Sequence, residues 1–264
     1  VVLMSQSSHK TKLQKQAAQN SLLGGSTLIR KVNTLLDKEI PNSQARFSER
    51  LTQNMDFSSS LKLSEVHGHL RILDKKSAAF STKNDGQITL LQEKKVALNA
   101  AFGRVQRAIL QTIKQSSDFK VEQPRYPLPK LNMENDKPDL SVYQAFYIAQ
   151  QKEMSAKIQG LRTYMRATLA ASSVNMAKLA LLDLTLEETI GFPLRNGFGA
   201  VAKVLLQYTQ RLEKDWQDDA QQEMIQGKDL SDFYNALRQL LLAELELRLQ
   251  PVQGMLDAFN YEVN

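Results

Sequence analysis

The sequence contains no cysteine. That absence excludes disulfide bonds, zinc sites built on thiolates and cysteine nucleophiles, and it is compatible with a reducing compartment. Glycine and proline are also scarce, with 11 and 7 residues in a chain of 264. An all-β fold needs many tight turns, and an α/β fold repeats glycine-rich loops after its strands. The scarcity of both residues therefore argues against these two fold classes.

Long apolar runs are missing as well. A membrane-spanning helix needs about 18 or more consecutive apolar residues, and stretches such as Leu240–Ala243 are interrupted by charge within a turn. We therefore expect no transmembrane segment and a cytoplasmic protein. The first acidic residue is Asp37. Residues 1–24 are accordingly predicted to form a disordered basic tail, although their composition also resembles that of a mitochondrial transit peptide.

Motifs that usually carry catalysis or cofactor binding are absent too. There is no Gly-x-Ser-x-Gly turn, no Walker loop and no Gly-x-Gly-x-x-Gly. His67 and His69 would point about 200° apart on a helix, and the remaining histidine, His9, lies in the predicted tail. The carboxylate pairs Glu187–Glu188 and Asp218–Asp219 are interpreted as solvated charge. We predict no catalytic residue, no metal site and no cofactor, and hence a protein that is not an enzyme.

Helical periodicity, in contrast, is present along most of the chain. Ser26 is a candidate N-cap, and the apolar residues that follow it recur at helical spacing until Pro41. Further caps at Ser43 and at the serines 58–60 extend this pattern. Residues 25–73 are therefore predicted to form an N-terminal helical module.

Residues 87–117 are predicted to form one long basic helix with a heptad pattern. Its apolar positions alternate in steps of three and four, interrupted by Lys95 and Thr112. These positions form a candidate interaction seam: Ile88, Leu91, Leu98, Phe102, Val105 and Ile109. The pattern requires a helix packed lengthwise on another helix, and it leaves open whether that helix belongs to the same chain.

Four prolines between residues 118 and 139 predict a Pro-rich linker, and residues 140–264 are predicted to form a C-terminal helical bundle. An apolar stripe runs from Tyr143 to Leu169 along the first helix of that bundle. No segment shows a sustained alternation of apolar and polar residues, the pattern of a half-buried strand. The predicted fold is therefore all-α, an elongated helical bundle with long coiled-coil-like helices.

Glycine and proline divide the rest of this bundle. Pro193, among the glycines of the segment 191–199, breaks or kinks the helix over 174–220, whose continuity stays open. Gly227 is predicted to stop that element and Asp229 to cap the last helix. Pro251 is predicted to kink the last helix.

Charge is distributed unevenly along the chain. Residues 1–130 carry 21 Lys and Arg against 10 Asp and Glu, a net of +11, whereas residues 131–264 carry 13 against 18, a net of −5. Five cations on the long helix form a candidate basic surface: Lys94, Lys95, Arg104, Arg107 and Lys114. Such a surface could follow a phosphate backbone. Glu244 and Arg248, four residues apart, are interpreted as a surface ion pair.

Several segments resemble a proteobacterial family named domain of unknown function 3348. They are Phe47–Leu51 (FSERL), Ala145–Gln151 (AFYIAQQ) and Ala243–Val252 (AELELRLQPV). The tryptophan often found in this family near Phe57 is absent, and the break at 191–199 is unusual for it. The resemblance implies a bacterial cytoplasmic protein without known catalytic residues. It also implies genes placed near envelope proteins, with the coiled coil of a membrane complex as a partner.

These observations favour a non-enzymatic helical scaffold or adaptor. Such a protein would self-associate or bind a partner's coiled coil, and it could form part of a complex associated with the cell envelope. The alternative is a nucleic-acid-associated protein that uses the basic N-terminal half. The partner, the oligomeric state and the biological process do not follow from the sequence.

Overall fold

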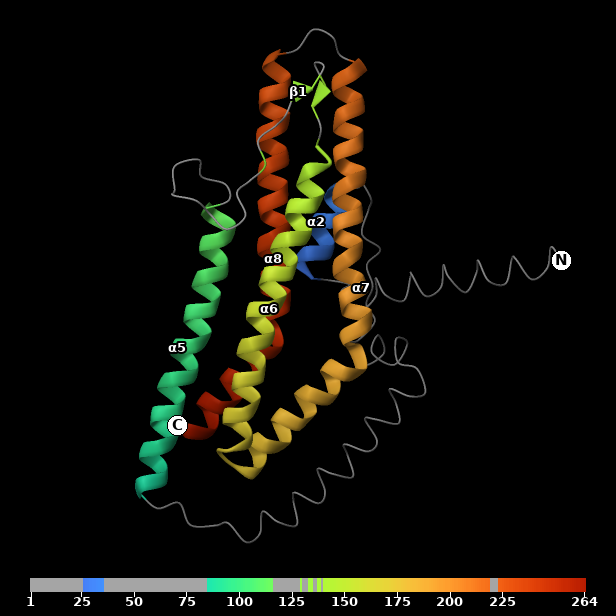
Figure 1. The fold of residues 1–264 in the computed structure, drawn as a ribbon. Helices are drawn as coiled ribbons and strands as arrows, with labels where there is room; N and C mark the ends of the chain where they lie inside the picture. The colour runs from blue at the N-terminus through green and yellow to red at the C-terminus, as the bar shows by residue number, and fades with distance from the viewer. Residues whose placement is uncertain are drawn as a thin grey trace, which may run out of the picture.

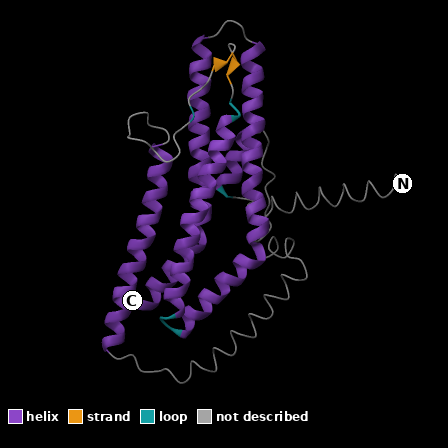
Figure 2. Cartoon of the chain, in the orientation of Figure 1, coloured by secondary structure: helices purple, strands orange, loops and turns teal. Residues whose placement is uncertain are grey.

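The computed structural model describes residues 26–35, 85–115, 129, 133–134, 137–138, 140–218 and 223–264. The helices among them are α2 (Thr27–Leu35), α5 (Asp85–Gln115), α6 (Val142–Ala170), α7 (Val174–Asp218) and α8 (Glu223–Val263). Two strands, β1 (Met133–Glu134) and β2 (Lys137–Pro138), form a small antiparallel pair. Apart from these strands and short connecting segments, the described chain is helical (Figure 2), which confirms the all-α prediction.

The helices form an elongated bundle (Figure 1). α6 packs against α7 and α8, α5 packs against α6 and α8, and the short α2 packs against α7 and α8. A tight turn at residues 171–173 joins α6 to α7. There the backbone N–H of Ala171 donates to the carbonyl of Ala167 at 3.3 Å, and the hydroxyl of Ser173 accepts from the N–H of Met176 at 3.2 Å. These bonds satisfy groups that helix ends would otherwise leave unpaired.

One apolar core runs through the bundle, and α2, α5, α6, α7 and α8 all contribute to it. The predicted stripe of α6 is confirmed, because Tyr143, Tyr147, Met154, Ile158 and Leu161 are buried, as are Met165 and Leu169 one and two turns farther on. The basic and acidic halves of the sequence therefore share one core. No helix in the described part of the chain is long and apolar enough to cross a membrane.

α7 is continuous from Val174 to Asp218, with Pro193 inside it. The segment 191–199 is therefore a kink and not a break. Proline has no N–H to donate to the carbonyl four residues earlier, and its ring crowds that carbonyl. The helix accordingly changes direction along its length (Figure 1), which is the usual consequence of an internal proline.

The predicted start of the last helix is wrong. α8 begins at Glu223 and continues through Gly227 and Asp229. A glycine in a helix interior costs only about 1 kcal/mol relative to alanine, and packing of the long apolar face beyond it outweighs that cost. Pro251 lies inside α8, as expected, and α8 turns before it reaches the C-terminus (Figure 1).

Several predictions fall wholly or partly on residues that the structure does not describe. The predicted tail at 1–24 lies outside the described residues, and of the module at 25–73 only residues 26–35 are described. There the hydroxyl of Ser26 accepts from the N–H of Ile29 at 3.3 Å, so the predicted cap of α2 is confirmed. Within the predicted linker at 118–139, the described residues include the extended strands β1 and β2.

Candidate helical interaction site

The predicted interaction seam of α5 faces the interior of its own chain. Three of its residues are buried and two more pack against the core: Leu98, Phe102, Ile109, Leu91 and Val105. Ile88, in the first turn of α5, is 46% exposed. The heptad pattern is thus satisfied by α6 and α8 of the same chain, and most of the seam does not face a second chain.

The predicted basic surface is divided by the fold. Lys94 donates from Nζ to the carbonyl of Ala171 at 2.8 Å, where it caps the end of α6. Lys95 donates to the side chain of Asn264. The remaining three cations are exposed: Arg104, Arg107 and Lys114. The five residues therefore do not form one free surface.

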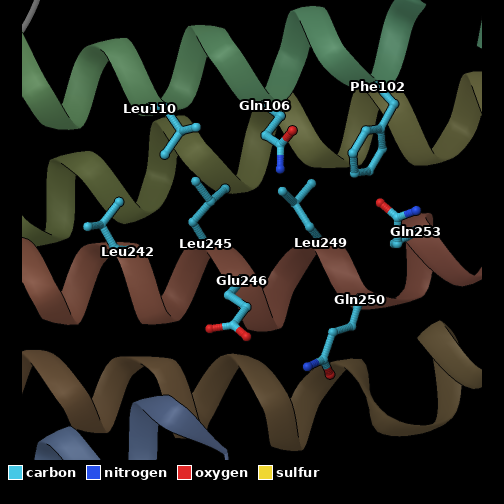
Figure 3. Close-up of a pocket in the computed structure, with 9 residues that line it drawn as sticks. All are labelled: Phe102, Gln106, Leu110, Leu242, Leu245, Glu246, Leu249, Gln250 and Gln253. Carbon is cyan, nitrogen blue, oxygen red and sulfur yellow. The ribbon is translucent and has the colours of Figure 1, made fainter. Parts of the chain in front are cut away.

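An open groove lies between α5 and α8, with a cavity volume of about 320 Å³ (Figure 3). Five apolar side chains line it: Phe102, Leu110, Leu242, Leu245 and Leu249. Four polar side chains complete the lining: Gln106, Glu246, Gln250 and Gln253. The leucines of α8 point toward α5, whereas Glu246 and Gln250 point away from it (Figure 3).

This lining resembles a seam between helices more than a small-molecule site. A small-molecule site usually combines apolar walls with a few polar groups that converge on the ligand. Here Glu246 and Gln250 point away from the gap between the two helices (Figure 3). The groove therefore suits apolar side chains that enter it from another helix.

Polar contacts hold the first half of α5 against the end of α8. The side-chain amides of Asn99 and Asn260 exchange two hydrogen bonds, at 2.9 and 3.3 Å. Gln92 donates from Nε2 to the carbonyl of Val263 at 3.3 Å. These contacts set the antiparallel register of the two helices and hence which of their residues meet at the groove.

A buried carboxylate joins α6, α7 and α8. Glu244 is 0% exposed and accepts from the hydroxyl of Tyr147 at 2.7 Å, from Nε2 of Gln151 at 2.8 Å and from Nε of Arg248 at 2.7 Å. Nη2 of Arg248 lies in ion-pair contact with the same carboxylate, also at 2.7 Å. Gln151 also donates to the carbonyl of Phe198 at 3.0 Å, and the Arg248 guanidinium lies 3.8 Å from the centre of the Phe198 ring. The charge is thus paired and its oxygens are hydrogen-bonded, as a charge in a low-dielectric core requires.

Glu244 and Arg248 are therefore not the surface pair that their spacing suggests. The contact between residues four apart is confirmed, but its exposure is wrong. Spacing identifies neighbours on a helix without saying which face turns inward. α8 contacts α2, α5, α6 and α7, so it is buried on several of its faces near Glu244. The buried neighbours of Glu244 in the sequence are Leu240, Leu241, Ala243 and Leu245.

A second ionic cluster fastens α6 to α7. Arg162 donates two hydrogen bonds to the carboxylate of Asp183, at 2.7 and 2.8 Å, and Arg166 contacts Glu187 at 2.6 Å. Arg162 also lies 3.6 Å from Glu187, and Arg166 lies 3.5 Å from Asp183, so the four charges form one group. The interpretation of Glu187 as solvated charge is therefore wrong, whereas Glu188 is exposed as predicted. Nothing is described of the side chains of Asp218 and Asp219.

A buried tyrosine, Tyr143, and a partly buried one, Tyr234, lie at the end of α6 nearest the strands. The hydroxyls of Tyr143 and Tyr234 lie 2.8 Å apart, and Tyr143 also donates to the carbonyl of Pro129 at 3.0 Å. Phe233 packs edge-on against Tyr143 with ring centres 5.1 Å apart. Burial, followed by the hydrogen bond and charge of Tyr234, raises the pKa of Tyr143 above its usual value. This hydroxyl accordingly stays protonated in the folded protein.

Acidic and histidine side chains do not gather into a metal site in the described part of the chain. No three or more of them are placed so that they could hold an ion. The three histidines considered above as ligands, His9, His67 and His69, lie outside the described residues.

Most of the chain matches one known protein family. Residues 14–261 match the family described as Protein of unknown function (DUF3348). The chain belongs to this family. No curated protein and no solved structure matches the chain.

In this DUF3348 protein the family match covers α2, α5, α6 and α7 and extends through α8 to residue 261, so it includes both walls of the groove and the Glu244 cluster. The family description assigns no function, so membership transfers no residue role. The groove did not follow from the sequence, because its lining residues on α5 and α8 are more than 130 residues apart in the chain and spacing within one helix says nothing of its neighbour. The sequence signal for this wall of the groove is the helical spacing of three leucines on α8, Leu242, Leu245 and Leu249.

Proposed function

We propose that the protein is a non-enzymatic helical scaffold or adaptor that binds a helix of another chain in the groove between α5 and α8. The observation that supports this proposal is the open apolar groove, lined by side chains of two neighbouring helices. A partner helix with apolar residues in steps of three and four would insert them between α5 and α8. That insertion would cover apolar surface of the partly buried Leu110 and Leu242.

Nucleic-acid binding has weaker support. Binding to a phosphate backbone depends on several cations that are free to contact phosphates. Lys94 and Lys95 donate to groups of their own chain, and Glu93 lies exposed on the same helix as the three outward cations. The proposal places the protein in the cytoplasm, which suits a chain without cysteine.

Replacing Gln250 by arginine tests this role. Gln250 is an exposed residue at the edge of the groove, so Gln250→Arg adds bulk and charge there without removing a core contact. In extracts of the source cells, the tagged wild-type chain is expected to elute as a complex larger than itself, and the variant is expected to lose most of that complex. Size-exclusion chromatography with detection of the tag gives both results.

Gln207→Arg is the matched control, because Gln207 is exposed on α7, which does not line the groove. It should elute as the wild type does. Complexes of equal size with Gln250→Arg and wild type would show that the groove is not the binding site. A wild-type chain that elutes alone would contradict the adaptor role itself.

A further inference from the structure

The two walls of the groove carry opposite charges on their outer sides. On α5, Arg107 and Lys114 are exposed and lie seven residues apart, which is about two helical turns and hence one face. On α8, Glu246 and Asp257 are exposed and lie eleven residues apart, about three turns and again one face. We call these the basic edge and the acidic edge. Among the described residues, neither Arg107 nor Glu246 has an ion-pair partner.

Arg107 and Glu246 lie at nearly the same level along the groove. Figure 3 shows Glu246 on α8 opposite the turn of α5 that carries Gln106, and Arg107 follows Gln106 in the chain. Arg107 also donates from Nε to the carbonyl of Gly103 at 3.0 Å, so its guanidinium lies along the outside of α5. A charge of each sign thus flanks the same stretch of the apolar lining.

This arrangement is self-complementary. We infer that the groove is covered by a second copy of this chain, related by a two-fold axis parallel to α5 and α8, so that Arg107 of each copy meets Glu246 of the other. A rotation about that axis places α5 of the second copy over α8 of the first and keeps every residue at its level. The apolar linings then face each other, and two symmetric Arg107–Glu246 pairs form at the edges.

Charge selects this orientation over the other two-fold arrangement. An axis that lies across the helices in the plane of the interface would place α5 over α5 and α8 over α8. The basic edge would then face a basic edge, and the acidic edge an acidic one, and like charges across an interface oppose association. The inference rests on the proposed function, because it names the chain whose apolar side chains cover the groove.

Charge reversal tests the pairing. Arg107→Glu and Glu246→Arg each turn two attractions into two repulsions, and each is expected to raise the dissociation constant of the dimer by about tenfold or more. The double variant R107E/E246R restores both attractions. Its dissociation constant should therefore lie within about threefold of that of the wild type. Sedimentation velocity over a concentration series of the purified full chain measures each constant.

Mixing supplies a sharper readout. The two single variants, which pair poorly with themselves, should form a one-to-one heterodimer. At one edge the glutamate introduced at position 107 meets the arginine introduced at position 246, and at the other edge the native pair of Arg107 and Glu246 forms. Arg104→Glu is the matched control: Arg104 is exposed on the same helix but does not line the groove, and its variant should dimerise as wild type does. Circular dichroism verifies that each variant is folded.

Three results would overturn the inference. They are a wild-type chain that stays monomeric at every concentration, a dimer that Arg107→Glu leaves unchanged, and single variants that fail to pair when mixed. If a reversed charge unfolds the chain, Arg107→Ala and Glu246→Ala replace it in a double-mutant cycle, where additive effects would contradict the contact. A monomeric chain whose Gln250→Arg variant still loses a cellular complex would retain the adaptor role and assign the groove to a different protein.

Discussion

Replacing Arg248 by methionine is expected to lower the free energy of unfolding by about 3–5 kcal/mol. The substitution keeps most of the apolar volume of the side chain but removes both the hydrogen bond and the ion-pair contact that its guanidinium makes with Glu244. Glu244 is 0% exposed, so it would keep a buried negative charge with no cation beside it. Removing one member of a buried ion pair costs more than the pair contributes, because the remaining charge stays desolvated.

Urea denaturation followed by circular dichroism measures this loss. Arg104→Met is the matched control, because Arg104 is exposed on α5, and surface substitutions usually change stability by less than about 0.5 kcal/mol. Arg248→Lys retains a cation but loses the two-pronged contact and the planar group over Phe198, so its stability should fall between those of wild type and methionine. Equal stability of Arg248→Met and Arg104→Met would contradict the burial of the Glu244 cluster.

Raising the pH above about 10 is expected to destabilise the protein through Tyr147 by about 1.4 kcal/mol per pH unit. Burial, followed by the negative charge of Glu244, raises the pKa of the Tyr147 hydroxyl well above its usual value of 10.0. Below pH 10 the folded and unfolded chains both hold this proton, and the stability is complete. Above it the unfolded chain releases a proton that the folded chain keeps, so the free energy of unfolding falls as pH rises.

Tyr147→Phe isolates this contribution. The variant should be less stable than wild type at pH 8, because Glu244 loses a hydrogen-bond donor, yet its stability should fall less steeply between pH 10 and 11. Tyr164→Phe, at a position that is 47% exposed, should keep the wild-type slope. Urea denaturation at a series of pH values gives the slopes. A slope for Tyr147→Phe as steep as that of wild type would show that this hydroxyl titrates in the folded protein.

Helix identity and length were predictable where an apolar stripe is long. Residues 87–117 were predicted as one helix, and α5 spans Asp85–Gln115. The stripe from Tyr143 to Leu169 likewise lies within α6. An apolar pattern that repeats in steps of three and four residues over many turns is compatible with few structures other than a helix. The continuity of α7 and the start of α8 were less predictable, because Pro193 and Gly227 weaken a helix locally while tertiary packing decides whether it continues.

The burial of Glu244 and the position of the groove were not predictable from spacing. The sequence shows that Glu244 and Arg248 are neighbours on a helix, but their burial depends on α6 and α7, which supply Tyr147, Gln151 and Phe198. The groove depends in the same way on how α5 meets α8. Both features arise from contacts between segments far apart in the chain, which a periodic pattern in one segment does not encode.

A photo-activated cross-linking residue placed at Gln250 tests most directly whether the groove binds a helix of another chain. We predict an adduct between two chains, mapped to residues 103–114 of a second copy, and no such adduct from the same residue at Gln207 on α7. Mass spectrometry of the adduct identifies the contact. Equal yields from the two positions would contradict binding at the groove, and so would an adduct within one chain to residues 36–84, which would show that the protein fills its own groove.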